Sequence, residues 1–127
     1  ANRIHGYFSP ASTVAGHVAA GKLVALAVTD AKRSQFFPDL PTMIESGVPD
    51  CESVLWFGIS APAGTPQPII DKLSRATNEA LKSDEVTKAL QAQTVAAMGG
   101  TPEQFRKHMA AEQKRWTDVV NAAGLRK

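Results

Sequence analysis

The sequence predicts an α/β fold built mainly on parallel strands, and two kinds of pattern support this prediction. Residues 23–29 and 54–60 are continuous apolar runs, which are typical of strands buried on both faces of a sheet. Before the first run and after the second, apolar residues recur at helical spacing. A strand, a helix and a second strand within so few residues is the arrangement of a parallel α/β unit.

The first such unit is expected at the N-terminus. Residues 4–8 form a short candidate strand, and Ser9 followed by Pro10 matches a helix N-cap with proline in the first helical position. The helical pattern continues to Gly21, a residue suited to the positive φ found just after many helices. Residues 23–29 then form the second strand.

Residues 30–49 are expected to be irregular because three prolines interrupt them. Thr42 and Glu45 have the spacing of a capping box, and Gly47 ends the short helix that they predict. Two interpretations of this stretch remain open: a segment that crosses between two lobes, or a long surface loop.

The C-terminal part is predicted to be largely helical. Thr65 is expected to cap a helix over 65–82, and Ser83 begins a shorter one. After a possible short strand at 94–98, Thr101-Pro102-Glu103-Gln104 combines an N-cap, a first-turn proline and a capping-box glutamine. The resulting helix over 102–123 carries Glu112 on its apolar face, where a carboxylate needs a basic partner or N–H donors.

Composition excludes several classes of protein. With 43% hydrophobic residues, 20% charged residues and a net charge of +2, the chain lacks the basic surface typical of nucleic-acid binding. The single cysteine excludes an intrachain disulfide, and no apolar run approaches the roughly 18 residues of a membrane span. The spacing of the histidines indicates no metal site.

The sequence also lacks the patterns of an enzyme. It contains no glycine-rich phosphate loop, no nucleophile elbow and no spacing that predicts a catalytic triad. We therefore expect no catalytic residues and no cofactor.

Several motifs, in order along nearly the whole chain, resemble those of one family. They are GKLVALAVT at 21–29, KRS at 32–34, PDLPTMIESG at 38–47, WFG at 56–58, APAGTP at 61–66, TPEQF at 101–105, and the pair Glu112 and Trp116. Together they resemble the signatures of the tripartite tricarboxylate transporter substrate-binding proteins, also called Bug receptors.

The resemblance implies part of a two-lobed, type II periplasmic-binding-protein fold with mainly parallel sheets. It implies that residues 1–34 end the second lobe, that 35–54 cross the hinge, and that 55–127 complete the first lobe. The chain, which begins without a signal peptide, is then expected to be the C-terminal part of a longer receptor.

The function implied is periplasmic capture of a small carboxylated metabolite in the cleft between the lobes. Expected partners are the carboxylate ligand and membrane transporter subunits or a sensor kinase, without nucleic acid and without direct insertion into a membrane. The alternatives are an interaction module that docks on a membrane partner and, less favoured, a small-molecule hydrolase.

The candidate ligand-binding residues lie mostly in one loop. Ligands of open parallel sheets bind beyond the carboxyl ends of the strands, where helix N-termini favour anions. The predicted contacts are Phe8, Ser9, Pro10, Ala11, Ser12 and Trp56, with the two serines as hydroxyl donors and Phe8 as a wall. The competing interpretations are that Ser9 is only an N-cap, that Ser12 is only solvated, and that Trp56 belongs to the core. Lys32 and Arg33 either grip a carboxylate at the hinge or are solvated.

Overall fold

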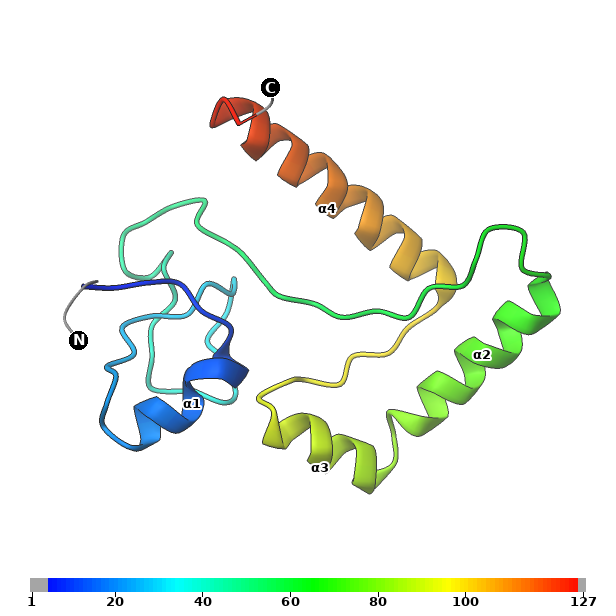
Figure 1. Ribbon diagram of the computed structural model, residues 1–127, viewed down its shortest axis with the longest axis horizontal. Helices are drawn as coiled ribbons and strands as arrows, with labels where there is room; N and C mark the ends of the chain where they lie inside the picture. The colour runs from blue at the N-terminus through cyan, green and yellow to red at the C-terminus, as the bar shows by residue number, and fades with distance from the viewer. Residues whose placement is uncertain (1–4, 126–127) are drawn as a thin grey trace. The chain divides into compact units, whose positions relative to one another are not determined.

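The computed structural model describes residues 5–125, and its regular elements in that range are four helices (Figure 1). Their bounds are Ala11–Ala19 (α1), Gln67–Ala80 (α2), Asp84–Ala92 (α3) and Pro102–Ala122 (α4). The contacts divide the chain into two compact units, one of Ala1–Phe57 with Lys88–Ala96 and the other of Gly58–Thr87 with Ala97–Lys127.

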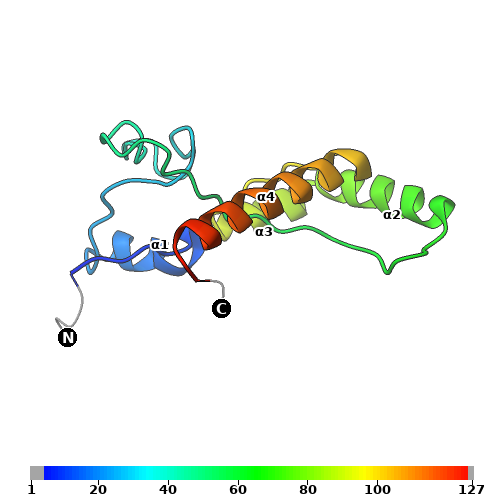
Figure 2. The same ribbon diagram turned by 90° about the horizontal axis from the view of Figure 1, so that it is seen from above.

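Helix α4 confirms its predicted caps. The Gln104 N–H donates to Thr101 Oγ1 at 3.1 Å, and the Thr101 N–H donates to Gln104 Oε1 at 2.8 Å, so the capping box is complete. Pro102 occupies the first helical position, and Gly124 follows the helix with a φ of 66°. The helix runs without interruption in both ribbon views (Figure 2).

The starts of α1 and α2 differ from the prediction by one or two residues. The N-cap of α1 is Pro10 instead of Ser9, the N-cap of α2 is Pro66 instead of Thr65, and neither helix has a side-chain cap. The Thr65 hydroxyl donates instead to the Pro62 carbonyl at 2.8 Å. Ser83 does cap α3, since its Oγ accepts a bond from the Val86 N–H at 3.3 Å.

The predicted strands do not form within residues 5–125. Residues 23–29, 54–60 and 94–98 contain no strand, and neither does the described part of 4–8, since Ile4 lies outside it. The β-pairing of this range consists of one isolated parallel bridge between Val28 and Thr42. A helix completes its hydrogen bonds within its own segment, whereas a strand needs a second strand beside it. The strands predicted for an α/β fold are therefore absent from the part of the chain that the structure describes, apart from this single bridge.

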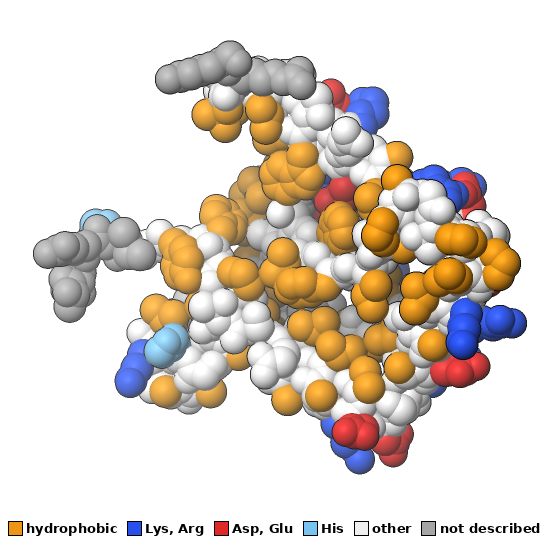
Figure 3. All heavy atoms as spheres, turned by 45° about the vertical axis from the view of Figure 1, so that its right-hand side comes forward, with side chains coloured by type: hydrophobic (Ala, Val, Ile, Leu, Met, Phe, Trp, Pro, Cys, Tyr) orange, Lys and Arg blue, Asp and Glu red, His pale blue; other side chains and the backbone are white. Residues whose placement is uncertain are grey.

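A hydrophobic core is also absent from the described residues. Among the described residues, the buried one is Thr42, which is 2% exposed. Large apolar side chains in the same range remain open to solvent. The face seen in Figure 3 shows hydrophobic side chains spread over its surface. The apolar runs thus have the composition of buried strands, but their side chains are not buried in this structure.

Candidate functional site

The predicted ligand loop leads directly into α1. Phe8 is 73% exposed, Ser9 is partly covered, and Pro10 is the N-cap residue of the helix. The Tyr7 hydroxyl donates to Ser9 Oγ at 2.7 Å. The prediction that Ser9 caps the helix is wrong, so the Ser9 hydroxyl is not committed to a backbone amide of α1.

The first turn of α1 presents backbone amides at the end of this loop. The Thr13 N–H donates to the Pro10 carbonyl at 3.0 Å, while Ala11 and Ser12 occupy the positions whose N–H groups a helix leaves unpaired. Ser12 is exposed. Amides at a helix N-terminus, together with the helix dipole, favour an anionic group.

Sequence analysis missed Tyr7, although its hydroxyl contacts one of the two predicted donors. A tyrosine two residues before Ser9 lies on the same side of an extended chain, and that spacing was the available signal. Ser9 Oγ thus accepts from Tyr7 and donates to the Pro10 carbonyl, at 3.4 Å, which is long for a hydrogen bond between oxygens.

Trp56 lies apart from this loop in sequence, within the segment 51–61, which has no helix or strand. Its side chain is 37% exposed, at the edge of the range expected for a surface residue. The structure therefore brings Phe8, Ser9, Pro10, Ala11 and Ser12 together at the start of α1 and places Trp56 on a separate extended segment.

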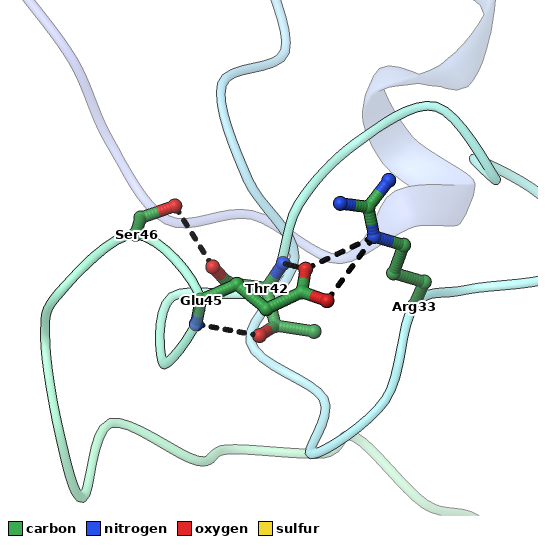
Figure 4. A network of polar contacts seen from close by, with 4 residues as sticks. All are labelled: Arg33, Thr42, Glu45 and Ser46. Atoms are coloured by element: carbon green, nitrogen blue, oxygen red, sulfur yellow. Dashed lines mark hydrogen bonds and ion pairs between the residues drawn. The ribbon is translucent and has the colours of Figure 1, made fainter.

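Arg33 belongs to a polar network around Thr42 (Figure 4). Its Nε donates to Glu45 at 3.0 Å, and the Thr42 N–H donates to the same carboxylate oxygen at 2.9 Å. The Glu45 N–H donates to Thr42 Oγ1 at 3.0 Å, and Ser46 Oγ donates to the Thr42 carbonyl. The predicted capping box is present, although it closes a turn and not a helix. Arg33 is thus paired with Glu45.

Two carboxyl groups of this unit have displaced pKa values. The Thr42 N–H, and then Arg33, hold the pKa of Glu45 below its usual value. Burial, and then the negative charge of Glu52, raise the pKa of Asp30. A lowered value marks a carboxylate that is stabilised as an ion, whereas a raised value marks one that resists ionisation.

Glu112 of α4 has the partners that its position required. The Trp116 indole N–H donates to Glu112 Oε2 at 3.2 Å, and Arg115 lies 3.5 Å from the other oxygen. The Glu112 side chain is 17% exposed, and the Arg115 guanidinium lies over the Trp116 ring at 5.8 Å from its centre. The structural pair predicted for Glu112 is confirmed.

Two further features of the described residues bear on function. Among residues 5–125 there is no group of three or more His, Cys, Asp or Glu side chains that would hold a metal ion. The helices of that range also lack the combination of length and hydropathy that a bilayer crossing requires.

Comparison with known proteins gives matches over nearly the whole chain. The model of a family described as "Tripartite tricarboxylate transporter family receptor" matches residues 4–125. Protein BugT of Bordetella pertussis is 42% identical over 110 residues, which make up 87% of this chain and 34% of BugT. A UPF0065 protein from the tcbD-tcbE intergenic region of Pseudomonas sp. strain P51 is 31% identical over 105 residues.

Solved structures are similar over the same range. R. palustris Rpa4515, determined with adipate, has a TM-score of 0.77 and 37% identity, and the match covers 89% of this chain and 38% of that one. The periplasmic binding protein BugD has a TM-score of 0.77 and 31% identity over 87% of this chain. This chain spans about a third of the length of the two curated relatives, BugT and the Pseudomonas protein.

Proposed function

We propose that this chain, which belongs to the tripartite tricarboxylate transporter receptor family, forms part of a receptor that captures a small carboxylate. The family is one of periplasmic binding proteins that serve as transport receptors, and it is not a family of enzymes. The proposal rests chiefly on Rpa4515, a structure with adipate that is similar to 89% of this chain.

The proposed ligand contacts are the loop at the start of α1 and Trp56. Ser9 and Ser12 would donate hydroxyl hydrogen bonds to a carboxylate, Phe8 would form a wall, and Pro10 with Ala11 would bring the first amides of α1 to the ligand. Support comes from the exposed position of the loop, the Ser9 hydroxyl that caps no helix, and the anion preference of a helix N-terminus.

We also propose the two-lobed organisation that the resemblance implies. Residues 1–34 would belong to the second lobe, 35–54 would cross the hinge, and 55–127 would belong to the first lobe. A ligand that contacts both lobes stabilises the closed receptor over the open one, because only the closed state makes both sets of contacts. The closed receptor would then be recognised by transporter subunits or, alternatively, by a membrane sensor kinase.

The experiment uses a BugT chimera, in which the full 127-residue chain replaces the matching third of BugT. Adipate is expected to raise the Tm of the chimera in a concentration-dependent manner and to be recovered unchanged. Hexanediamide has the same length without the charges, and it is expected to leave Tm unchanged. Conversion of adipate, or an equal response to both compounds, contradicts the proposal.

Single variants of the chimera test the site. Ser9→Ala and Ser12→Ala are each expected to weaken adipate binding about tenfold in calorimetry, because each removes a hydrogen bond to a charged group. Ser83→Ala is the matched control, since Ser83 caps α3. If both loop variants bind adipate as tightly as the Ser83 variant, the ligand does not contact this loop.

A further inference from the structure

The Tyr7 side chain is joined to the proposed ligand loop by a hydrogen bond. Its hydroxyl donates to Ser9 Oγ at 2.7 Å, a length typical of a well-formed bond between two hydroxyl groups. Both residues precede α1 in a segment that has no helix or strand, and residues two apart in an extended chain lie on the same side. Tyr7 therefore influences how the Ser9 hydroxyl can be used.

The Ser9 hydroxyl is arranged to act as a donor. A serine hydroxyl donates one hydrogen bond and accepts up to two, and Tyr7 fills one of the accepting positions of Ser9. The Ser9 proton points to the Pro10 carbonyl across 3.4 Å, which is too long for a strong bond between oxygens. Because a hydroxyl that accepts a hydrogen bond becomes a better donor, the bond from Tyr7 strengthens a proton that is only weakly held.

A carboxylate fits this arrangement better than an amide does. A carboxylate has only acceptors, and its bonds from hydroxyl groups are shorter and stronger than those between neutral groups. If the Ser9 proton turns from Pro10 to a carboxylate, the Pro10 carbonyl keeps its bond from the Thr13 N–H at 3.0 Å, so no acceptor is left unpaired. An amide also presents N–H donors, and for these Ser9 has one accepting position fewer.

We propose that Tyr7 is a positioning residue of the ligand site, which sets the Ser9 hydroxyl as a donor and so favours carboxylates over amides. This inference rests on the proposed function, because it concerns the same loop and the same class of ligand. Tyr7 acts through Ser9 and not through a contact of its own with the ligand. The Tyr7 side chain, 61% exposed, leaves the neighbouring Ser9 hydroxyl accessible from solvent.

The test measures the affinities of the BugT chimera for adipate and hexanediamide by displacement of labelled adipate. Tyr7→Phe keeps the ring and removes the donor, so adipate is expected to bind about fivefold more weakly, the effect of losing one neutral hydrogen bond. The affinity for hexanediamide is not expected to fall, because an accepting position of Ser9 becomes free, and the ratio of the two affinities therefore falls about fivefold. Thr65→Val is the matched control, since it also removes a hydroxyl with an exposed local bond, to Pro62, and both affinities are expected to stay the same.

A double-variant cycle locates the effect of Tyr7. In the Ser9→Ala background, Tyr7→Phe is expected to leave the adipate affinity unchanged, because the group that Tyr7 positions is gone. A further loss in that background would assign Tyr7 to direct ligand contact and overturn the inference. Equal weakening of both compounds by Tyr7→Phe, which is the mark of a general change in the loop, overturns it as well. A chimera that binds adipate but keeps its affinity ratio in Tyr7→Phe contradicts this inference alone, whereas an unmodified chimera that binds no adipate contradicts the proposed function with it.

Discussion

The side-chain amide of Asn78 pairs with both backbone groups of Gly100. Asn78 Nδ2 donates to the Gly100 carbonyl at 2.9 Å, and the Gly100 N–H donates to Asn78 Oδ1 at 2.8 Å. Asn78 lies near the end of α2, and Gly100 lies just before the cap of α4. The pair thus connects two helices of one unit through a loop whose glycines have φ values of 67° and 135°.

Substituting Asn78 is expected to release this loop. In Asn78→Ala, the Gly100 amide should exchange about fivefold faster, because a hydrogen bond contributes about 1 kcal/mol. Asn78→Asp keeps an acceptor for the Gly100 N–H and should have a smaller effect. Hydrogen exchange followed by NMR measures both, with Asn121→Ala, at an exposed position of α4, as the control. Equal exchange in all variants would show that Asn78 does not hold the loop.

The Phe105 ring covers Gly58 closely enough to exclude any side chain there. A Cβ built on Gly58 would meet three atoms of the ring, the third of them at 3.0 Å. Gly58→Ala is therefore expected to displace residues around 58 from the first turn of α4, seen as chemical-shift changes at Phe105. Gly16→Ala is the control, because a Cβ at Gly16 meets nothing within 4 Å and should stabilise α1 by about 0.5–1 kcal/mol.

A double variant separates the steric cause from a general effect of alanine. Phe105→Leu in the Gly58→Ala background should return the segment toward its original position, because the smaller side chain leaves room for the new Cβ. If Gly58→Ala alone leaves the Phe105 resonances unchanged, the close approach is not a feature of the protein in solution.

The turn at 42–46 is expected to loosen in acid. The pKa of Glu45 is lower in the folded turn than its ordinary value of 4.5, so its contribution to stability is complete above about that pH and is lost as the pH falls through the lower value. The Thr42 amide should therefore exchange faster, relative to the intrinsic rate, below about pH 4.5. Glu45→Gln should remove this pH dependence, whereas Glu79→Gln, in α2, should keep it.

Glu112→Gln tests the carboxylate on the apolar face of α4. Loss of the Arg115 contact is expected to lower the stability of the helix by about 0.5 kcal/mol, because the pair is only partly shielded from solvent. Glu112→Ala, which also removes the acceptor for the Trp116 indole, should cost more and shift the Trp116 fluorescence. The measurement uses a Trp56→Phe background, which leaves Trp116 as the single tryptophan. Unchanged helicity in both variants would contradict the structural role.

Much of the helical structure follows from local chemistry. Thr101 and Gln104 complete each other's bonds within one turn, as do Thr42 and Glu45, and both capping boxes were predicted from spacing alone. The predicted N-caps of α1 and α2 were wrong, because in each helix the proline one residue later occupies the N-cap position. Which residue becomes the N-cap depends on the backbone angles at that point of the chain. The motif order was sufficient to predict the family.

The candidate site was predicted only as a stretch of residues. Spacing placed Ser9 and Ser12 at a helix start, but the bond from Tyr7 to Ser9 became evident only in the structure. The pairing of Arg33 with Glu45 also joins residues that no local pattern connects.

By itself, the sequence determined the positions of the four helices to within one or two residues, and it determined which segments have the composition of buried strands. Tertiary structure decided that residues 23–29 and 54–60 form no strand in the described structure, that Val28 pairs with Thr42, and that Asn78 holds Gly100. The physical reason is the range of the interactions: helix bonds and caps close within four residues, whereas strand pairing and burial require residues distant in the chain.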